Sequence, residues 1–256
     1  MSEMQFVQWQ VKEGAGILTF KRPPLNVINI VLLRELLSAL ETAAKEKTLR
    51  VLVLRSEGKM FSAGVDVADH TADKVNEMIS LFDRVCTSLL DFPTPTLAAV
   101  QGHALGGGCE LALCCDLIVA VDSANFGQPE IKLAVVAPIA ALRMPALIGY
   151  RRAAELLFTG DNVNAVEAAS LGLINRAVSA DQFDSTVNQF VNKLTALSAP
   201  ALQMCKRAVR LGADCWNLKH LPAMEKLYLN DLMLTEDANE GVASFMEKRA
   251  AVWKHK

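Results

Sequence analysis

The sequence predicts an α/β protein whose last third is helical. In the first two-thirds of the chain, short apolar runs of strand character alternate with runs that place apolar residues at helical spacing. One of these strands, the run RVLVLRS at 50–56, is almost wholly apolar, which is typical of a parallel strand buried on both faces. From about Asp181 onward, nearly every segment has the helical period instead.

The first elements form a hairpin and a crossover. FVQWQV and ILTF alternate like two paired strands on either side of a Gly14–Gly16 turn. The prolines and asparagine of KRPPLNVIN then require an irregular loop. Residues 30–47 have apolar positions on one helical face and charges on the other. Because a strand precedes this helix and another follows it, we expect the two strands to be parallel.

The middle of the chain is expected to continue in the same way. A helix should run to about Leu90 and end at the PTPT segment, 93–96. The apolar strand Leu97–Val100 leads into a turn with three consecutive glycines, which the helical run CELALCCDL and the strand IVAV follow. Further short helices are expected in RRAAELLFTGD and AVEAASLGLIN.

Composition excludes several classes of protein. With 52 % hydrophobic and 21 % charged residues, the 256-residue chain is globular and can bury a large core. A net charge of −2 provides no basic surface for nucleic acid or anionic membrane. No apolar run reaches the roughly 18 residues of a membrane span. The start, MSEMQFVQWQV, has no signal-peptide pattern, so we expect a cytoplasmic protein.

The cysteines give no indication of a disulfide framework. None of the six forms a CxxC pair, and most lie in apolar helical runs. We therefore expect reduced, buried thiols at all six positions, which are Cys86, Cys109, Cys114, Cys115, Cys205 and Cys215.

The stretch 101–130 contains the strongest functional pattern. The glycine turn, residues 106–108, allows a ligand to approach the backbone, and the first amides of the next helix lack intrahelical partners. Such a turn favours a negatively charged oxygen. Glu110 lies in the first turn of that helix and Glu130 follows the next strand, so two carboxylates are available to add or remove water. The turn lacks the P-loop and GxGxxG spacings, and no GxSxG elbow occurs in the chain.

A second glycine turn, FSAGVDV, provides another close backbone approach at Gly64. An oxyanion hole requires two converging N–H donors, so two such turns are more informative than one. The spacing of the nearby Asp66, Asp69, His70 and Asp73 fits no EF-hand or zinc motif. We expect these four residues to cap and begin a helix, and we predict no metal site.

Plainer interpretations stay open for each segment taken alone. The two glycine turns are also typical of an ordinary helix start and of the end of a strand. Glu110 would then only complement the helix dipole, and Glu130 would be a solvated loop residue. His103, beside the glycine turn, is interpreted as a packed, hydrogen-bonded turn histidine.

Together, FSAGVDV, AVQGHALGGGCELALCCD and FGQPEIKL resemble the enoyl-CoA hydratase (crotonase) superfamily. FTGD, AASLGL and EGVASFMEKR extend the resemblance over essentially the whole chain. It implies a crotonase (ClpP-like) spiral of ββα units in residues 1–195, with a C-terminal helical trimerisation region in residues 196–256. It further implies homotrimers or hexamers, acyl-CoA thioester substrates, and no metal or redox cofactor.

Position by position, the resemblance assigns the oxyanion hole to the backbone N–H groups of Val65 and Gly107. It assigns the catalytic pair to Glu110 and Glu130, one acting as base toward water and the other delivering a proton to carbon. Closely coupled carboxylates titrate as a pair, so the two roles are not divided between them. The substrate and CoA positions that it implies are Ala63, Val65, Asp66, Val67, Ala68, Gly106, Pro138, Phe245 and Lys248.

One segment departs from the family pattern. Where ordinary 2-enoyl-CoA hydratases have a PGAGG segment, this chain has APIAA at 137–141, and Pro138 has no N–H to donate. The segment KRPPLNVIN, together with FSAGVDVADHT and FGQPEIKL-x-V-x-x-P, is most similar to cyclohexa-1,5-diene-1-carbonyl-CoA hydratases of anaerobic benzoyl-CoA degradation. A flat ring would suit a pocket walled by Val135, Val136, Pro138 and Ile139.

Alternatives to this substrate stay open. The first is a hydratase of linear 2-enoyl-CoA. A crotonase-fold isomerase or thioesterase would keep the oxyanion hole and use one glutamate. A non-catalytic CoA-binding or RNA-binding relative has no support in the sequence, because both acids are present and there is no basic patch.

Overall fold

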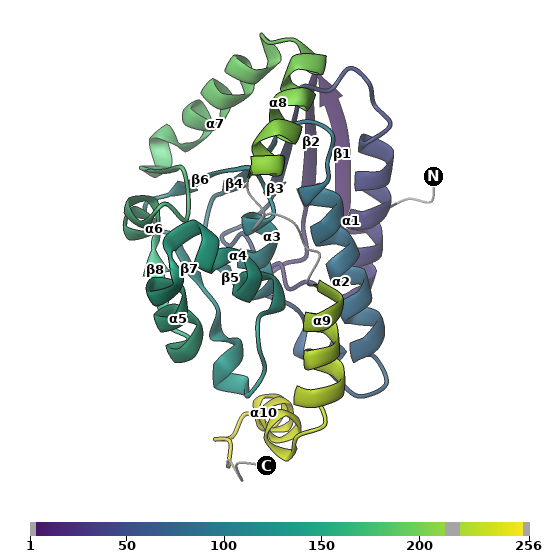
Figure 1. Cartoon of the computed structure of the whole chain (residues 1–256), viewed down its shortest axis with the longest axis vertical. Helices are drawn as coiled ribbons and strands as arrows, with labels where there is room; N and C mark the ends of the chain where they lie inside the picture. The colour runs from purple at the N-terminus through teal and green to yellow at the C-terminus, as the bar shows by residue number, and fades with distance from the viewer. Residues whose placement is uncertain (1–3, 213–220, 253–256) are drawn as a thin grey trace.

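The computed structural model describes residues 4–212 and 221–252 and has the predicted α/β architecture (Figure 1). Its main sheet has the order β1-β2-β3-β4-β6-β9. β1 and β2 are antiparallel, and every later neighbouring pair is parallel, so the predicted hairpin and crossover are confirmed. The strands are β1 (Val7–Lys12), β2 (Ala15–Phe20), β3 (Val51–Ser56), β4 (Thr96–Val100), β6 (Leu117–Val121) and β9 (Arg176–Val178).

A second, smaller sheet follows the main one and produces the spiral. It contains β5 (Ala104–Leu105), β7 (Asn125–Gly127) and β8 (Asn162–Asn164). Isolated parallel bridges, Ile28 to Val65 and Ser62 to Ala104, extend its pairing pattern. Each turn of chain thus enters the main sheet, pairs briefly in the small sheet and then forms a helix. This repetition is the predicted ββα spiral.

Helices cover the sheets and fill the space between them. Asn29 caps the first of them through its side chain, which accepts from the Leu32 N–H. This helix ends at Ala43, four residues before the predicted end. The helices are α1 (Ile30–Ala43), α2 (Val75–Leu90), α3 (Gly107–Leu113), α4 (Pro138–Ile148), α5 (Tyr150–Thr159), α6 (Ala165–Leu171), α7 (Ala180–Thr195), α8 (Ala199–Gly212), α9 (Leu221–Lys226) and α10 (Glu236–Met246).

Within residues 4–212 and 221–252, three shorter helical segments accompany these helices. Two are 3₁₀ turns, η1 (Val67–Asp69) and η2 (Pro129–Leu133), and η5 (Leu227–Leu232) is a π-helix that continues α9. Asp66 caps η1, whereas Asp69 accepts a hydrogen bond from Ile30 N–H at the start of α1. The prediction that these residues cap and begin a helix is therefore confirmed for η1, which Asp66 caps and which contains Asp69, whereas α2 starts after Lys74 without a side-chain cap.

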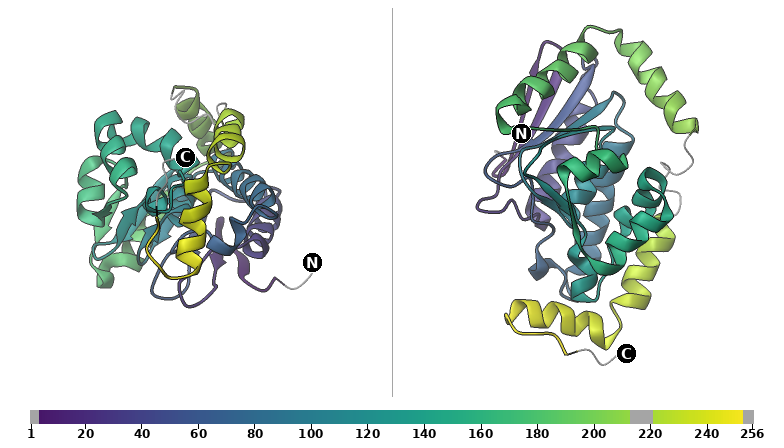
Figure 2. Two further views of the ribbon diagram at one scale, coloured as in Figure 1. Left: turned by 90° about the horizontal axis from the view of Figure 1, so that it is seen from below. Right: turned by 90° about the vertical axis from the view of Figure 1, so that its left-hand side faces the viewer.

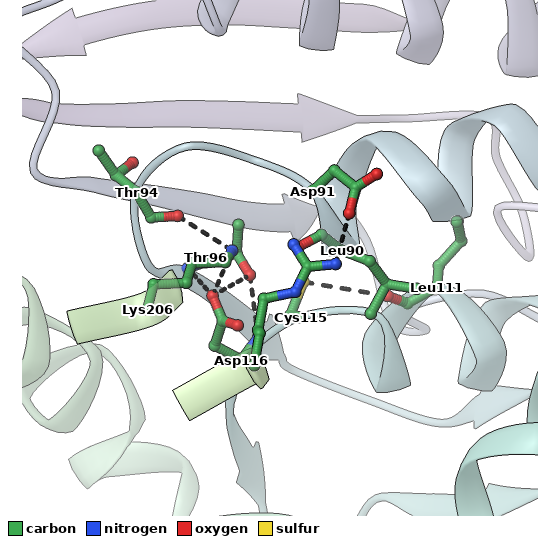
Figure 3. Close-up of polar contacts among 9 residues, drawn as sticks. Leu90, Asp91, Thr94, Thr96, Leu111, Cys115, Asp116 and Lys206 are labelled. Carbon is green, nitrogen blue, oxygen red and sulfur yellow. Dashed lines mark hydrogen bonds and ion pairs between the residues drawn. The ribbon is translucent and has the colours of Figure 1, made fainter. Parts of the chain in front are cut away.

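The C-terminal helices lie at two ends of the molecule. α7 and α8 lie at one end, and α10 lies across the other (Figures 1 and 2). α8 is attached to the core by Lys206, which is 7 % exposed. Its ammonium group lies 2.7 Å from Asp116 and donates to the Thr94 carbonyl at 3.2 Å (Figure 3).

The thiols differ from the prediction at one position. Cys86, Cys109, Cys114 and Cys115 are free and buried, as expected. Cys205 is free but exposed, because it lies on the outward side of α8. Cys215 lies outside the described residues. Within the described part of the chain, no helix combines the length and apolar character needed to span a membrane.

Candidate active site

The two glycine turns meet because neighbouring spiral turns pair in register. Ser62 N–H donates to the His103 carbonyl at 3.1 Å, and Leu105 N–H donates to the Ser62 carbonyl at 2.9 Å. This parallel register matches Ser62 with Ala104, so Val65 and Gly107 occupy equivalent positions three residues further on. A Cβ atom on Gly64 would stand 3.8 Å from the Gly107 nitrogen, which shows how closely the turns approach.

The backbone N–H groups at these positions are free within the described chain. The Ile28 N–H donates to the Gly64 carbonyl, and the Ile28 carbonyl accepts from the Asp66 N–H. The N–H of Val65, which lies between Gly64 and Asp66, therefore points away from Ile28. Gly107 begins α3, where an N–H has no intrahelical acceptor. Gly64 has a φ of +110°, a conformation that glycine adopts at little cost.

Glu110 lies in the first turn of α3 and is only 3 % exposed. Its Oε1 atom accepts a hydrogen bond from the Ala140 N–H at 2.9 Å. Burial is the larger cause that raises its pKa to about 8, and the charge of Glu130 adds to it, while the N–H groups of Ala140 and Ile139 act in the opposite direction. These donors belong to the first turn of α4, where Pro138 occupies a position that needs no N–H.

Glu130 begins η2 and faces Gly106. One carboxylate oxygen occupies the space that a side chain on Gly106 would need, and the other oxygen has no hydrogen-bond partner among the described residues. Burial raises the pKa of Glu130 to about 7. Near neutral pH the two glutamates therefore hold a proton between them, so one carboxyl is available as an acid and one as a base.

Both glutamates open into a cavity of about 360 Å³. The free N–H groups of Val65 and Gly107 border the same cavity. Its wall contains residues from both the predicted core region, 1–195, and the predicted C-terminal region, 196–256. The side chains and backbone that line it include Ala63, Gly64, Val65, Val67, His70, Met78, Ile79, Phe82, Asp83, Gly106, Gly107, Glu110, Pro129, Glu130, Lys132, Leu133, Val135, Val136, Pro138, Tyr228, Val242 and Phe245.

This arrangement agrees with comparisons to known proteins. Residues 10–256 match the enoyl-CoA hydratase/isomerase family. The chain belongs to this family. It is 33 % identical to cyclohexa-1,5-dienecarbonyl-CoA hydratase of Thauera aromatica, over 97 % of this chain and 96 % of that protein. It is 36 % identical to a probable enoyl-CoA hydratase of Rhizobium meliloti (strain 1021), over 94 % and 95 %.

A solved structure supports the same assignment. An enoyl-CoA hydratase subunit from Geobacillus kaustophilus HTA426 superposes with a TM-score of 0.76 at 34 % identity, and all of both chains is covered. The predicted family and crotonase fold are thus confirmed. The chain is accordingly an enzyme of the hydro-lyase class, as the sequence predicted.

The nine residues that were predicted to bind substrate or CoA divide into two groups. Six of them line the cavity, namely Ala63, Val65, Val67, Gly106, Pro138 and Phe245. Asp66 turns away to cap η1 and to pair with Arg22 at 3.2 Å, and Ala68 and Lys248 also lie outside the cavity wall. A contact of these three residues with CoA remains a prediction.

The expected pocket wall and the turn histidine can also be placed. Val135 and Val136 line the cavity beside Pro138. Ile139 is fully buried and does not line the cavity, so this part of the predicted wall is wrong. His103 Nδ1 accepts a hydrogen bond from Asn125 N–H at 3.0 Å, which agrees with the interpretation as a packed turn histidine. Among the described residues, no cluster of three or more His, Cys, Asp and Glu side chains has the arrangement of a metal site.

Four polar side chains that line the cavity, those of His70, Asp83, Lys132 and Tyr228, were not predicted as site residues from the sequence. Asp83 faces the cavity from α2, and its sequence signal was a carboxylate on the apolar stripe of an amphipathic helix. Tyr228 lies on η5 and is 2 % exposed. Burial is the larger cause that raises its pKa, followed by the charges of Glu130 and Glu110, so the phenol stays protonated. A π-helical turn has no clear sequence signature, so Tyr228 was not predictable.

Proposed function

We propose that this enzyme hydrates a conjugated cyclic dienoyl-CoA. The reaction converts cyclohexa-1,5-diene-1-carbonyl-CoA to 6-hydroxycyclohex-1-ene-1-carbonyl-CoA, in anaerobic benzoyl-CoA degradation. The main support for hydration is that Glu110, Glu130 and the free N–H groups of Val65 and Gly107 border one cavity. The support for a cyclic diene is the sequence resemblance, the Thauera relative and the position of Pro138 in the cavity wall.

The two amides supply the electrostatic part of the mechanism. The thioester oxygen accepts hydrogen bonds from Val65 N–H and Gly107 N–H, and these bonds strengthen as negative charge reaches the oxygen. Because both donors are held by backbone pairing, they need no rearrangement during the reaction. Loss of one such donor typically costs about 10²–10³-fold in kcat.

Carboxyl groups of the cavity supply the base and the acid, and the Glu110–Glu130 pair is the base toward water. The ionised carboxyl takes a proton from water, and the hydroxide oxygen bonds to C2, the β-carbon. The electron pair moves through the diene and onto the thioester oxygen. The O–H bond of a protonated carboxyl in the cavity then breaks as a C5–H bond forms at the far end of the diene, and the C5–C6 double bond shifts to lie between C6 and C1, the carbon that bears the carbonyl group. The sum is the addition of one water molecule.

Pro138 provides the structural link to substrate choice. It begins α4, so the N–H groups of Ile139 and Ala140 remain available to Glu110 although Pro138 itself has none. The proline thereby leaves the catalytic carboxylate supported while it changes the shape of the cavity wall beside Val135 and Val136. A rigid apolar wall of this kind suits a flat ring.

A side-by-side hydration assay tests the proposal. The purified enzyme is given crotonyl-CoA or cyclohexa-1,5-diene-1-carbonyl-CoA, and the product is identified by mass. We expect kcat/KM to be at least tenfold higher for the cyclic diene. A higher value for crotonyl-CoA would contradict the cyclic substrate, and no water addition to either would contradict the function of the glutamate pair.

A linear 2-enoyl-CoA is the second candidate substrate. The observation that favours it is the identity of 36 % to the Rhizobium protein, which exceeds the 33 % to the Thauera protein. An isomerase that uses one glutamate is a weaker alternative, and full activity of a Glu110→Gln variant would favour it.

We also infer that the enzyme is a cytoplasmic trimer or a dimer of trimers. The family resemblance supports assembly, and large apolar side chains are exposed on the C-terminal segments, where the trimerisation region is expected. They include Leu197, Met204, Val209, Leu234 and Met246. Mass photometry of the purified enzyme distinguishes a monomer from a trimer or a hexamer.

A further inference from the structure

A third carboxylate lines the cavity that contains Glu110 and Glu130. Asp83 lies on α2 and is 8 % exposed. It shares one helical face with Met78, Ile79 and Phe82, which also line the cavity. These neighbours are apolar, so burying a carboxyl group among them lowers the stability of the fold. Such a cost suggests that the carboxyl group has a functional role.

Asp83 is held by no partner within the described part of the chain. No described side chain or backbone N–H forms a hydrogen bond or an ion pair with its carboxylate. The adjacent Arg84 pairs with Glu41 instead, at 3.5 Å. Buried carboxylates are normally paired or hydrogen-bonded, and exceptions are frequent at functional sites.

Asp83 also borders a second cavity on its other side. This cavity has a volume of about 330 Å³ and is lined mainly by polar side chains of α1, α2 and α9, among them Glu41, Ser80, Thr87, Ser88 and Glu225. The two sets of lining residues have Asp83 in common. Water in the second cavity can therefore exchange protons with the same carboxyl that faces the first.

The surroundings keep this carboxyl protonated up to neutral pH. Burial is the largest cause, and the charges of Glu110 and then Glu225 act in the same direction, raising the pKa of Asp83 to about 7. His70 and Lys132 also face the cavity. An acid whose pKa lies near the working pH is suited to proton transfer.

We propose that Asp83 is a further catalytic acid, which donates the proton to C5 of the cyclic diene. This inference rests on the proposed function. In a linear enoyl-CoA the two reacting carbons are adjacent, so one carboxyl pair reaches both. In the cyclic diene, C2 and C5 lie across the ring, and a donor on α2 approaches from a different element than α3 and η2.

The step is balanced in atoms and charge. The Glu110–Glu130 pair takes one proton from water, and the hydroxide oxygen bonds to C2. The Asp83 O–H bond breaks as the C5–H bond forms. The Asp83 carboxylate then regains a proton from water in the second cavity, while the glutamate pair releases its proton to solvent, so the net change is the addition of water.

The test compares Asp83→Asn with wild type in the full-length enzyme. Asparagine keeps the size of the side chain but has no acidic proton to transfer to carbon. We expect kcat for the cyclic diene to fall by about 10²-fold or more, and the ratio of diene to crotonyl-CoA turnover to fall at least tenfold. If Asp83 must be protonated, wild-type kcat should decline above about pH 7. The residual activity of Asp83→Asn should lack this decline, and Asp83→Glu should restore part of the rate.

Glu77→Gln is the matched control, because it removes one carboxylate from the exposed side of the same helix. If wild type hydrates the cyclic diene and Asp83→Asn keeps its kcat within about threefold with an unchanged pH profile, the inference is overturned while the proposed function stands. Equal loss on both substrates together with a lower melting temperature would assign Asp83 a structural role and also overturn it. If wild type does not hydrate the diene, the proposed function is wrong, and the inference about Asp83 is overturned with it.

Discussion

The Ala140 N–H donates a hydrogen bond to Glu110 Oε1 at 2.9 Å. This contact joins the segment that differs from the family pattern to α3, the helix that carries Glu110. Ala140 belongs to APIAA, the segment that replaces the glycine-rich one of ordinary hydratases. Because Pro138 stands at the first position of α4, the amides that follow it stay free to hold the carboxylate. The substitution therefore alters the cavity wall without releasing Glu110.

Glutamine at either catalytic position should abolish most of the hydration. Glu110→Gln keeps an oxygen that accepts from Ala140 N–H, and Glu130→Gln keeps the size of the side chain, but neither amide transfers a proton. We expect kcat to fall by about 10²–10⁴-fold for each variant, with CoA-ester binding retained. Steady-state kinetics and isothermal titration with a non-reactive acyl-CoA measure the two effects. A variant that keeps more than half of wild-type kcat would contradict the paired mechanism.

The buried carboxyl of Glu110 should lower the free energy of unfolding as the pH rises. The folded-state pKa of Glu110, about 8, lies above its ordinary value of 4.5, so the folded protein binds more protons than the unfolded chain between these values. Stability should therefore fall as pH rises from about 4.5 to 8. Relative to wild type, Glu110→Gln should gain roughly 2–4 kcal/mol in free energy of unfolding at pH 8 and little near pH 4.5. Denaturant melts at both pH values check this, and a pH-independent difference would refute it.

Activity should show an acid limb with its midpoint near pH 7. Below the pKa of Glu130, about 7, both glutamates are protonated and neither can take a proton from water. We expect kcat/KM to fall about tenfold for each pH unit below that midpoint, because one ionised carboxyl is required. A pH–rate profile on the preferred substrate measures the limb. A flat profile between pH 5 and 8 would show that no ionised glutamate is needed.

A side chain on Gly106 should displace Glu130. Gly106 has a φ of +50°, and the methyl group of Gly106→Ala would occupy the position of a Glu130 carboxylate oxygen. We expect a loss in kcat of about 10²-fold, the typical result of shifting a catalytic group by about 1 Å. Gly58→Ala is the control, because Gly58 also has a positive φ but no atom lies near an added Cβ. Similar kinetics for both variants would argue against the close contact.

The buried ion pair of α8 should matter for stability. Lys206→Met removes the ammonium group from Asp116 and from the Thr94 carbonyl (Figure 3). This leaves a partly buried carboxylate without its cation, and the expected loss is about 3–5 kcal/mol in free energy of unfolding. Lys193→Met, at an exposed position of α7, should change it by less than about 0.5 kcal/mol. Equal melting curves for the two variants would show that Lys206 is not needed to hold α8.

Local patterns in the sequence were sufficient for much of the fold. The alternation of FVQWQV and ILTF predicted the hairpin, and the apolar stripe after Ile30 predicted α1, because side-chain periodicity decides which face is buried. The glycine turn before Glu110 was also a local signal. The predicted end of α1 was too late, since capping and fraying at a helix end depend on neighbours in space.

The sequence by itself determined which residues could do chemistry, and tertiary structure decided which of them meet. Glycine conformations and carboxylate positions are local properties, so Gly64, Gly106 and the two glutamates were visible from the start. The register that sets Val65 beside Gly107, and the packing that brings Asp83 and Tyr228 to one cavity, join segments far apart in the chain. Such long-range pairing depends on the whole core, because many buried contacts together select one register and exclude the others.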